Sequence, residues 1–531
     1  MKLHALLLGV ANAEVVGPAD VDVSEVRDDS RAVGAGDLFA AVPGVAANGM
    51  GFVADAITRG ARVLLVETGA GEVAAFDGKS DGTIVRVPSV RHALGIMAAN
   101  RFATPGQAPL TLTAVTGTNG KTTTTYLLEA MLHAAGLRAG VVGTIAYRVG
   151  GPVGGAGFSR PAPLTTPGAL ALHALFAEMR AAGASDAVLE ASSHALHQGR
   201  LEGCRFRVAG LTNLTQDHLD YHGTMDAYLD AKAILFERLL DRGAGVAVLP
   251  IDRPEGVALR ARARATGCPV LGVAMRPQHG ADVAPLSIQS SSAGLRLRLG
   301  TPDGPLEVVS PLVGAFNLAN IVLAVGMAVA RGLSQDAIVA GLRALPGVPG
   351  RLERVPNRRD VLCVVDYAHS PDAIERAIEV LRPLVAPGGR LITVFGCGGD
   401  RDRGKRPGMA AAATRGSDLA IVTSDNPRTE DPASILAMIV AGIDRAAIAE
   451  VDAAALPAAT RGFCVIADRR AAIRAAVVAA RAGDVVLLAG KGHEDYQIVG
   501  RDRLHFDDRE EATAAFATAP PRASSPAESR T

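Results

Sequence analysis

Residues 111–128 have the sequence TLTAVTGTNGKTTTTYLL, and the rest of the chain is organised around them. Residues 112–115 alternate apolar and β-branched side chains, which predicts a buried strand. A glycine loop at 117–120 follows, and Lys121 begins a run with helical periodicity. A strand, a glycine loop and a helix N-terminus together suit a phosphate, because the unpaired N–H groups and the dipole at the start of the helix attract an anion.

Lys121 and Thr122 carry the chemistry of this stretch. The Lys121 ammonium can reach the terminal phosphates of a nucleotide, and the Thr122 hydroxyl can ligate Mg²⁺. The full phosphate-loop motif has a glycine five residues before Gly120, where this chain has Val115. The alternative is an ordinary strand-to-helix turn, but the strand, the glycines and the Lys-Thr pair follow one another in the order that a phosphate site requires.

Length and composition narrow the class of protein. A chain of 531 residues is too long for one hydrophobic core, so we expect three domains. The 54 basic and 54 acidic residues give a net charge of +0, which leaves no basic field for a nucleic-acid partner. No segment approaches the roughly 18 uninterrupted apolar residues of a membrane span, so we expect no membrane insertion.

The cysteines and the N-terminus indicate the compartment. The five cysteines are scattered and form no CxxC pair, which is typical of a reducing compartment and argues against a disulfide scaffold or a zinc site. Residues 5–10 form an apolar run before Ala11-Asn12-Ala13, as in a signal peptide, but the run is short and His4 precedes it. We therefore expect a short first helix.

The order of predicted elements indicates an α/β protein with three domains and a tail. Short strands at 37–42, 62–66 and 83–87 belong to a small N-terminal α/β domain. In the C-terminal part, strands alternate with helices, which predicts a doubly wound, Rossmann-like parallel sheet. The expected ranges are an N-terminal domain at 1–108, a central parallel-sheet domain with the phosphate loop at 109–346, a C-terminal domain at 347–517 and a disordered tail at 518–531.

Polar groups follow the predicted strands of the central domain. Glu190 follows a strand at 186–189, where a carboxylate points into the crevice in which parallel sheets bind ligands. The pairs His194/His197 and His218/His222 have metal-like spacing, although one histidine of each pair is more simply a structural hydrogen-bonding residue. A strand is also predicted at 141–145, before the glycine-rich stretch Gly150–Gly157. Thr166 is expected to cap a helix that begins at Pro167.

The C-terminal strands also end in polar motifs. These motifs follow predicted strands at 361–366, 390–395, 419–423 and 484–489, and they are Asp366–Pro371, Gly396–Arg401, Ser424–Arg428 and Gly490–Glu494. The glycines of the second motif are too few and too irregularly spaced for a dinucleotide fingerprint. We therefore expect a ligand site of another kind at this edge of the sheet.

Together these motifs resemble those of the Mur ligase family of cell-wall synthesis over nearly the whole chain. The family elements are Gly117–Thr122, Glu190–His194, Asn213–His222, Asn317–Asn320, Gly350–Glu353 and Asp366–Pro371. Within the family the chain resembles the branch that adds the third amino acid, meso-diaminopimelate. The markers of that branch are Thr165–Pro167, Gly396–Pro407, Asp425–Arg428 and Gly490–Gln497.

The resemblance implies an ATP-dependent ligase of peptidoglycan synthesis, with roles in cell shape, cell division and the cell cycle. Its substrates would be UDP-N-acetylmuramoyl-L-alanyl-D-glutamate, meso-diaminopimelate and ATP, with Mg²⁺ as cofactor. The acceptor carboxylate would be activated as an acyl phosphate before the amine attacks, and ADP and phosphate would be released. Because this step brings two anions together, it needs cations, here Lys121 and Mg²⁺. We expect a cytoplasmic monomer.

The resemblance also assigns site residues. The catalytic group would be Lys121, Glu190, His218 and Lys232, and the Mg²⁺ ligands Thr122, Glu190, His218 and Lys232 as its carbamate (N6-carboxylysine). ATP would bind Gly117, Thr118, Asn119, Gly120, Lys121, Thr122, Asn317, Asn320, Arg351 and Asp366. The nucleotide-sugar dipeptide would bind Ser30, Asn48, Asn119, Thr165, Thr166, Ser192, Gln198 and Arg200. Diaminopimelate would bind Arg401, Asp425, Asn426, Pro427, Arg428, Gly490 and Glu494.

Several of these residues would be assigned no such role from residue type alone. A helical lysine such as Lys232 is ordinarily a solvated surface charge, and Ser30 is ordinarily a turn or capping residue. Residues 425–428 alone suggest an Asn-Pro turn with a surface arginine. In the family context, the planar guanidinium of Arg428 is the group that would grip the second carboxylate of diaminopimelate.

Three functions remain open at this point. The first is the diaminopimelate-adding ligase. The second is a ligase of the same architecture that adds lysine or elongates folate with glutamate, which the motif 425–428 weighs against. The third is a nucleotide-binding subunit without ligase chemistry, which the intact Lys121, Glu190, His218 and Lys232 weigh against.

Overall fold

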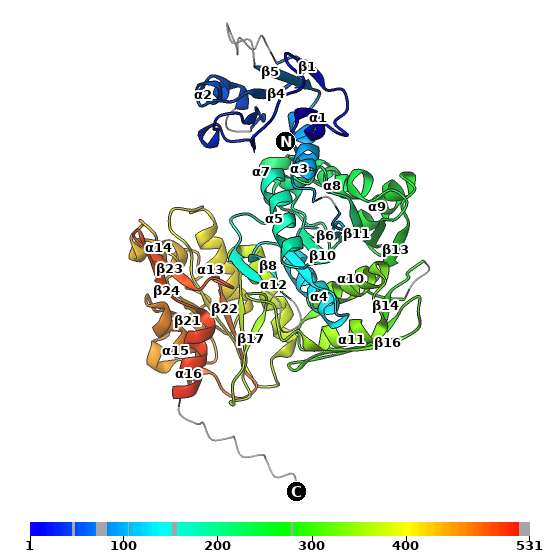
Figure 1. The fold of residues 1–531 in the computed structure, drawn as a ribbon. Coiled ribbons are helices and arrows are strands. Elements are labelled where there is room, and N and C mark those ends of the chain that lie inside the picture. The colour runs from blue at the N-terminus through cyan, green and yellow to red at the C-terminus, as the bar shows by residue number, and fades with distance from the viewer. Residues whose placement is uncertain (45–47, 71–81, 105, 151–156, 278–279, 520–531) are drawn as a thin grey trace. The chain divides into compact units, whose positions relative to one another are not determined.

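The computed structural model describes residues 1–44, 48–70, 82–104, 106–150, 157–277 and 280–519 (Figure 1). Most of the glycine-rich stretch 150–157 and most of the predicted tail lie outside the described residues. The chain divides into two compact units, which are described separately. Unit one is Met1–Ser287, Arg298–Glu307 and Ala319–Ala344, and unit two is Ile288–Leu297, Val308–Leu318 and Leu345–Thr531.

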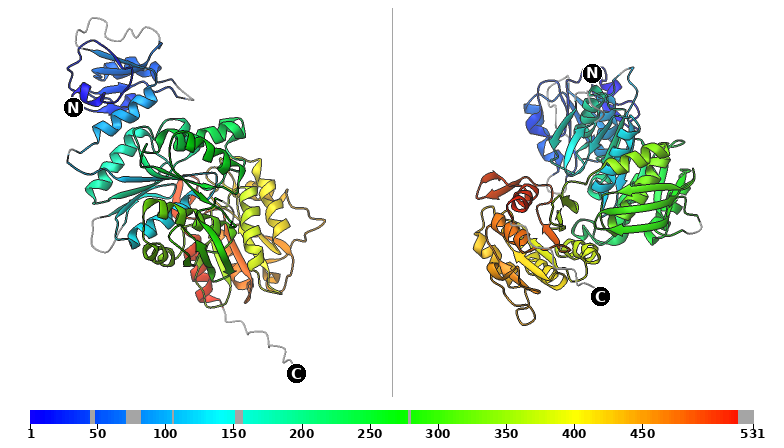
Figure 2. Two further views of the ribbon diagram at one scale, coloured as in Figure 1. Left: turned by 90° about the vertical axis from the view of Figure 1, so that its right-hand side faces the viewer. Right: turned by 90° about the horizontal axis from the view of Figure 1, so that it is seen from below.

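The N-terminal domain is built on a five-stranded sheet of order β1-β5-β4-β3-β2. Its strands pair in parallel except β1, which runs antiparallel to β5. The views in Figure 2 show these blue strands as a sheet of their own. The strands are β1 (Glu14–Val16), β2 (Val26–Arg27), β3 (Leu38–Ala40), β4 (Val63–Glu67) and β5 (Thr83–Val87), and the helices are α1 (Leu3–Leu6), α2 (Val53–Thr58) and α3 (Val90–Arg101).

The central domain contains an eight-stranded sheet of order β13-β12-β11-β6-β10-β7-β8-β9. It is parallel from β13 to β7, and β8 and β9 add an antiparallel edge. Its strands are β6 (Thr111–Thr116), β7 (Ala139–Val142), β8 (Ala146–Val149), β9 (Phe158–Pro161), β10 (Asp186–Glu190), β11 (Phe206–Leu211), β12 (Val246–Pro250) and β13 (Val270–Val273). The strand predicted at 141–145 is therefore earlier, because Gly143 and Thr144 form the turn after β7.

The register of this sheet determines what lies at its carboxyl edge. Val115 on β6 pairs with Glu190 on β10 and with Gly210 on β11. The glycine loop after β6 and the carboxylate of Glu190 therefore lie at the same edge, as is usual for ligand sites of parallel sheets.

The helices of the central domain are α4 (Lys121–Ala134), α5 (Ala169–Ala181), α6 (Ser193–His197), α7 (Leu219–His222), α8 (Met225–Ile234), the π-helix Leu235–Leu239 and α9 (Pro254–Ala265).

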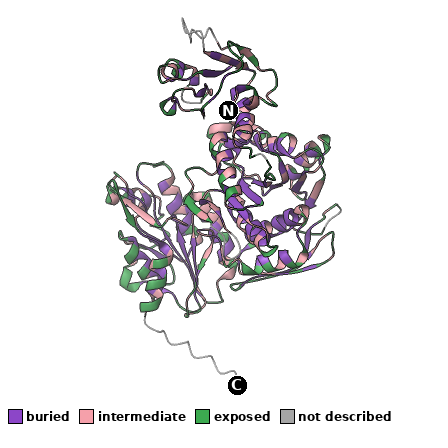
Figure 3. Ribbon diagram, in the orientation of Figure 1, coloured by how far each residue is buried: buried purple, intermediate pink, exposed green. Residues whose placement is uncertain are grey.

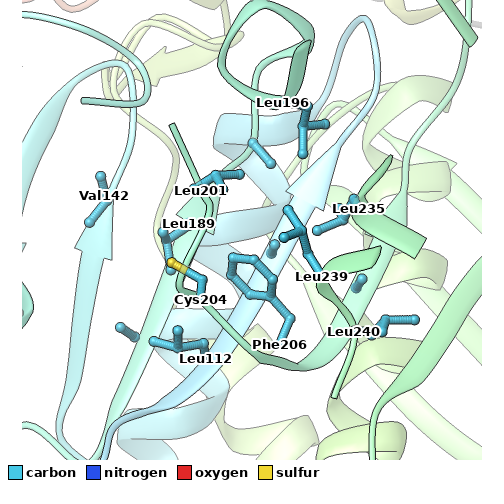
Figure 4. Packing of buried hydrophobic residues seen from close by; sticks show 14 of the residues in the cluster. Leu112, Val142, Leu189, Leu196, Leu201, Cys204, Phe206, Leu235, Leu239 and Leu240 are labelled. Carbon is cyan, nitrogen blue, oxygen red and sulfur yellow. The ribbon is translucent and has the colours of Figure 1, made fainter. Parts of the chain in front are cut away.

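An apolar core packs against the strands of this sheet. Figure 4 shows the Phe206 ring among leucine side chains that include Leu112, Leu189 and Leu239. Burial of each such side chain stabilises the fold by roughly 1.5–3 kcal/mol. The strand ends that carry the polar residues are thus held by a rigid, close-packed layer.

The segment after the central sheet forms a small sheet and two helices. The sheet has the order β14-β15-β16, with strands β14 (Ala284–Ser291), β15 (Gly294–Gly300) and β16 (Leu306–Ser310). The helices are α10 (Ala315–Arg331) and α11 (Gln335–Ala344). Gly341 of α11 packs against the backbone of Met131 on α4, so α11 covers the helix that starts at the glycine loop.

The C-terminal domain, in unit two, contains a six-stranded sheet of order β17-β18-β22-β19-β20-β21, parallel from β18 to β21. Figure 3 shows its strands buried (purple) and the outer faces of its helices exposed (green). The strands are β17 (Glu353–Val355), β18 (Leu362–Asp366), β19 (Leu391–Phe395), β20 (Leu419–Val422), β21 (Gly462–Val465) and β22 (Val485–Ala489), with the hairpin β23 (Tyr496–Val499) and β24 (Asp502–His505). The helices are α12 (Pro371–Leu381), α13 (Lys405–Gly416), α14 (Pro432–Val440), α15 (Arg469–Ala479) and α16 (Asp508–Thr518).

The predicted α/β fold class is confirmed in both units, including the doubly wound C-terminal sheet. All five cysteines are buried and free, in agreement with the absence of a disulfide pattern: Cys204, Cys268, Cys363, Cys397 and Cys464. A search of the described residues finds no helix with the length and apolar character needed to cross a bilayer.

Candidate active site

The glycine loop has the conformation that its sequence predicts. Gly120 adopts φ +90° and immediately precedes the first residue of α4, with no side chain capping the helix. The Lys121 ammonium donates to the carbonyls of Gly117 and Thr118, both at 2.9 Å. A Cβ at position 120 would lie 2.3 Å from Asn320 Oδ1, so the loop leaves no room for a side chain there. The loop therefore places the start of α4 where an anion could bind.

Glu190 stands beside the start of α4. Its carboxylate is buried and accepts from the Thr122 hydroxyl at 3.1 Å, and from the amide and hydroxyl of Thr144, both at 3.0 Å. These contacts bring together two of the predicted Mg²⁺ ligands, Thr122 and Glu190. A carboxylate and a hydroxyl beside a phosphate-binding loop are the hard oxygen donors that Mg²⁺ prefers, so this pair fits the ion.

Lys232 is a buried residue of α8, contrary to the surface position expected from residue type. Its side chain is 1% exposed, and its Nζ donates to the Gly117 carbonyl at 3.0 Å. The Nζ also lies 4.2 Å from the centre of the Tyr228 ring. Burial, together with the charge of Lys121, holds the pKa of Lys232 well below its usual range. A neutral amine can add to CO₂, whereas an ammonium cannot.

His218 is the predicted metal ligand that the structure does not bring to Glu190. Its described ring contacts are with His194, at 4.8 Å between ring centres, and with Tyr228, at 6.2 Å. Its Nδ1 lies 3.6 Å from an Asp217 carboxylate oxygen. Within the described ranges, no three His, Cys, Asp or Glu side chains are grouped closely enough to hold a metal ion. The described contacts therefore join two of the four predicted ligands, Thr122 and Glu190.

A connected polar network contains the nucleotide-sugar residues predicted in the central domain. The Thr166 hydroxyl donates to the Glu190 carbonyl at 2.6 Å and to the Ser192 hydroxyl at 3.2 Å. Arg200 donates to the Thr166 carbonyl at 3.0 Å and to Gln198 Oε1. The Thr165 hydroxyl lies 3.1 Å from that of Thr144, which extends the network toward Glu190.

The prediction that Thr166 caps a helix is wrong. Helix α5 begins at Ala169, with Gly168 at the capping position. The Thr166 hydroxyl instead donates to the Glu190 carbonyl at the end of β10, 24 residues away in the chain. A tertiary contact has replaced the local one.

The N-terminal domain provides Ser30 and Asn48. Ser30 is buried at the start of a short 3₁₀ helix, and Asn48 caps another such helix by accepting from the Met50 amide at 3.0 Å. Arg91 donates to the carbonyls of Pro43 and Gln198, the second at 3.1 Å. The arginine therefore links the loop before Asn48 to the nucleotide-sugar network of the central domain.

The predicted nucleotide residues fall in both units. In unit one the Asn119 amide donates to Asn213 Oδ1 at 3.1 Å, and Asn320 stands against Gly120. In unit two the buried Asn317 side chain donates to the Val313 carbonyl at 2.8 Å. The other two residues of unit two, Arg351 and Asp366, lie at the end of β18.

Asp366 and Arg351 both belong to unit two. The Asp366 carboxylate accepts from the amides of Leu352 at 2.8 Å and Ala368 at 2.9 Å. Burial raises the pKa of Asp366, and the Arg351 charge and these amides oppose that shift. Arg351 lies over the Tyr367 ring, 5.3 Å from its centre.

Four predicted diaminopimelate residues meet at the ends of β20 and β22. The Asn426 amide donates to Glu494 Oε2 at 2.9 Å, and Asn426 Oδ1 accepts from the Ile498 amide at 3.0 Å. Gly490, at φ +117°, follows β22, and a Cβ there would lie 3.8 Å from Asp425 Oδ2. Asp425, Asn426, Gly490 and Glu494 thus form one cluster from two chain segments.

Arg428 is not a loose surface side chain. Its backbone adopts φ 51° and bonds to the β23–β24 hairpin, donating to Ile498 and accepting from Gly500. Its guanidinium donates to the Gly399 carbonyl at 2.8 Å. Arg401, on the same loop as Gly399, is exposed. The segment that contains Pro427 is therefore tied to the loop that contains Arg401.

Three residues of these networks were not predicted from the sequence: Thr144, Tyr228 and Lys491. Tyr228 is buried, lies against Lys232 and meets the Thr118 hydroxyl at 3.2 Å. Lys491 is fully buried beside Asn426 and Glu494. A local signal existed only for Lys491, which stands between two residues already assigned to the site, Gly490 and Glu494.

Comparisons with known proteins identify the family. Three family profiles match the chain: "Mur ligase family, catalytic domain" at residues 22–102, "Mur ligase middle domain" at 115–328 and "Mur ligase, glutamate ligase domain" at 350–492. The protein named UDP-N-acetylmuramoyl-L-alanyl-D-glutamate--2,6-diaminopimelate ligase from Geobacter sulfurreducens is 44% identical over 520 residues, covering 97% of this chain and 99% of that relative. The protein of the same name from Gloeobacter violaceus is 44% identical over 517 residues, covering 97% and 98%.

A solved structure with the same enzyme name is also similar. It has a TM-score of 0.71 and 34% sequence identity, and the match covers 97% of this chain and 99% of that one. Similarity in sequence, domain order and fold thus extends over nearly the whole chain, and this protein belongs to the Mur ligase family.

Proposed function

We propose that this protein joins meso-diaminopimelate to UDP-N-acetylmuramoyl-L-alanyl-D-glutamate at the expense of ATP, as a cytoplasmic, monomeric enzyme of peptidoglycan precursor synthesis. Membership of the family indicates ATP-dependent formation of an amide bond. The observation that carries the choice of substrates is the 44% identity, over 97% of the chain, to relatives named for this reaction. The lysine-adding and folate-elongating alternatives are not favoured.

The reaction proceeds in two displacements. An oxygen of one of the two glutamate carboxylates attacks the γ-phosphorus of ATP, and ADP leaves with the electrons of the broken P–O bond. The amine of diaminopimelate then attacks the acyl carbon, phosphate leaves, and the nitrogen loses a proton. Lys121 and the N–H groups at the start of α4 stabilise the negative charge that both displacements gather on the phosphate oxygens.

Thr122, Glu190, His218 and the carbamate of Lys232 would hold Mg²⁺. The bound ions would neutralise the phosphate oxygens and so allow the anionic carboxylate to approach. The burial of Lys232 and its lowered pKa support the carbamate, because only the neutral form of an amine reacts with CO₂. Thr144 orients the Glu190 carboxylate through two hydrogen bonds at 3.0 Å.

The remaining residues would bind the substrates as the resemblance assigns them. ATP is assigned to the loop 117–122 and to Asn317, Asn320, Arg351 and Asp366. The nucleotide-sugar dipeptide is assigned to the connected network of Thr165, Thr166, Ser192, Gln198 and Arg200, with Ser30, Asn48 and Asn119. Diaminopimelate is assigned to Arg401, residues 425–428, Gly490 and Glu494. The domains would span 1–108, 109–346 and 347–517, ranges that contain the three matched segments.

The test is phosphate release with the purified protein. The reaction mixture contains ATP, Mg²⁺ and either the nucleotide-sugar dipeptide or a folate as acceptor, and meso-diaminopimelate, L-lysine and L-glutamate are supplied one at a time. We expect phosphate release with meso-diaminopimelate, at a kcat/KM on the order of 10³ above that with L-lysine, because the half-buried Arg428 guanidinium would lack its anion. Equal rates with lysine, or release only with a folate acceptor, would refute the proposal.

A further inference from the structure

Lys491 is a fully buried lysine that has no place in the mechanism described so far. Only six of the chain's 54 basic residues are lysines, so arginine is the usual cation of this protein. The Lys491 side chain is 0% exposed, and its Nζ donates to Asn426 Oδ1 at 3.2 Å. The same Nζ lies 3.4 Å from Glu494 Oε2 and 3.6 Å from Asp425 Oδ1.

All three partners of Lys491 belong to the proposed diaminopimelate site. Asp425 and Asn426 follow β20, whereas Glu494 follows β22, and β19 stands between these strands in the sheet. The Lys491 ammonium therefore lies close to both the loop after β20 and the loop after β22, which follow strands that are not neighbours in the sheet. Asp425 Oδ1 is buried and accepts no hydrogen bond from any described residue, so an acceptor at this site remains open to a ligand.

The charges of this cluster suit one end of diaminopimelate. Asp425 and Glu494 contribute two negative charges, and Lys491 neutralises one of them, which leaves a net charge of −1. The far end of diaminopimelate carries an ammonium and a carboxylate. Arg428 can pair with the carboxylate, and the net negative cluster can accept the ammonium. Two buried carboxylates without Lys491 would repel each other or take up a proton.

We propose that Lys491 is a positioning residue for amino-acid selection, which rests on the function proposed above. It holds the Asp425 and Glu494 carboxylates and the Asn426 amide as the receptor for the distal ammonium of diaminopimelate. Lys491 itself does not touch the substrate, since its ammonium is buried beneath these three side chains.

The test compares meso-diaminopimelate with 2-aminopimelate, which keeps the distal carboxylate and lacks the distal ammonium. Lys491→Met keeps most of the length of the side chain and removes its charge. We expect its KM for diaminopimelate to rise about tenfold, because the ammonium loses its oriented acceptors. KM for 2-aminopimelate, ATP and the nucleotide-sugar dipeptide should stay within twofold of the wild-type values. The preference for diaminopimelate over 2-aminopimelate therefore falls about tenfold, a change that a general loss of stability does not produce.

The matched control is Arg390→Met. Arg390 is also buried in this domain and pairs with Asp484 at 2.8 Å, at the other end of β22 from Lys491. Its loss should lower the melting temperature and leave the preference for diaminopimelate unchanged. An unchanged preference in Lys491→Met, or an equal rise of KM for every substrate, would overturn the inference.

A second variant can test the same role if Lys491→Met does not fold. Lys491→Met/Glu494→Gln removes one charge of each sign and keeps the net charge of the cluster. Its KM for diaminopimelate should lie within threefold of that of Glu494→Gln alone, because Lys491 acts through that carboxylate. A tenfold further rise would contradict this role. A wild-type enzyme that releases no phosphate with diaminopimelate would refute the proposed function instead, so the two failures are distinguishable.

Discussion

The contacts of the Lys232 amine differ from those of an ordinary, solvated lysine. Its Nζ has one carbonyl acceptor, the ring of Tyr228 beside it and the charge of Lys121 nearby. Removing an unpaired ammonium from water costs several kcal/mol, on the order of the penalty for any buried ion. Burial and the charge of Lys121 therefore lower the pKa of this amine, which favours the neutral form that carbamate formation requires.

The first prediction concerns this amine. Lys232→Ala should lower kcat by roughly 10²-fold or more, the size of effect seen when one group that stabilises developing charge is removed. A high concentration of bicarbonate or of a short-chain carboxylate should restore part of the phosphate release, because a carboxylate can replace the lost anion. Lys2→Ala, which removes a partly exposed lysine that pairs with Asp20 and Asp22, is the control and should behave as wild type. Wild-type turnover in Lys232→Ala would contradict the carbamate.

The second prediction concerns selection by Arg428. Arg428→Ala should lower kcat/KM for meso-diaminopimelate by on the order of 10³, since the second carboxylate loses its bidentate partner. KM for ATP and for the nucleotide-sugar dipeptide should remain close to the wild-type values. The control is Arg445→Ala, which removes an exposed arginine of the same domain that pairs with Glu450. A diaminopimelate-to-lysine ratio of kcat/KM equal to that of wild type would exclude Arg428 as the selecting residue.

At the scale of single elements, the ends of neighbouring parallel strands assemble the site. The glycine loop follows β6, Glu190 ends β10, and the turn after β7 provides Thr144. Each strand is fixed by a buried apolar run, so its polar last residues are presented at a defined place. The sheet, more than the loops, therefore fixes the positions of the site residues.

The third prediction tests how closely the β7 turn is fitted to Glu190. A Cβ added at Gly143 would lie 2.3 Å from Glu190 Oε1, so Gly143→Ala must displace the carboxylate. We expect kcat to fall by roughly 10²-fold, as misplacement of a reacting group by about 1 Å does, with little loss of melting temperature. Gly168→Ala is the control, because a Cβ there meets nothing within 4 Å. Full activity of Gly143→Ala would show that the position of Glu190 is not critical.

The strands were predictable from the sequence because buried parallel strands are short apolar runs bounded by polar or glycine residues. The capping role of Thr166 was predicted wrongly because its hydroxyl bonds to β10, and a local pattern cannot show such a contact. The burial of Lys232 and the position of Lys491 between two loops could not be predicted from the sequence for the same reason. Both depend on which strands become neighbours, and the sequence does not state that order.

At the scale of the whole molecule, the N-terminal domain is attached to the central domain around Glu202. In α3, His92 Nδ1 lies 2.9 Å from the Glu202 carboxylate, and Arg91 donates to the Gln198 carbonyl. Gly95 of the same helix packs against the backbone of Glu202, and Arg180 of α5 donates to the Phe102 carbonyl at 2.6 Å. These contacts hold the domain that carries Ser30 and Asn48 beside the segment that carries Gln198 and Arg200.

The last prediction follows from this attachment. A Cβ at Gly95 would lie 2.5 Å from Glu202 Cβ and 2.6 Å from its carbonyl oxygen, so Gly95→Ala must push α3 away from the central domain. Both contacts are with the backbone or the first side-chain carbon, which cannot yield by a change of rotamer. The alanine is itself a better helix former than glycine, by about 1 kcal/mol, so the N-terminal domain should remain folded.

The expected result of Gly95→Ala is a rise in KM confined to one substrate. The nucleotide-sugar dipeptide would contact residues on both sides of this attachment, so its KM should increase about tenfold when the two sets no longer fit the ligand together. KM for ATP and for diaminopimelate should stay within twofold of wild type, because their proposed residues lie outside the N-terminal domain. Gly51→Ala, a substitution into open space in the same domain, is the control. If steady-state kinetics showed no change in KM for the dipeptide, or the same change for all three substrates, the N-terminal domain would have no selective part in binding it.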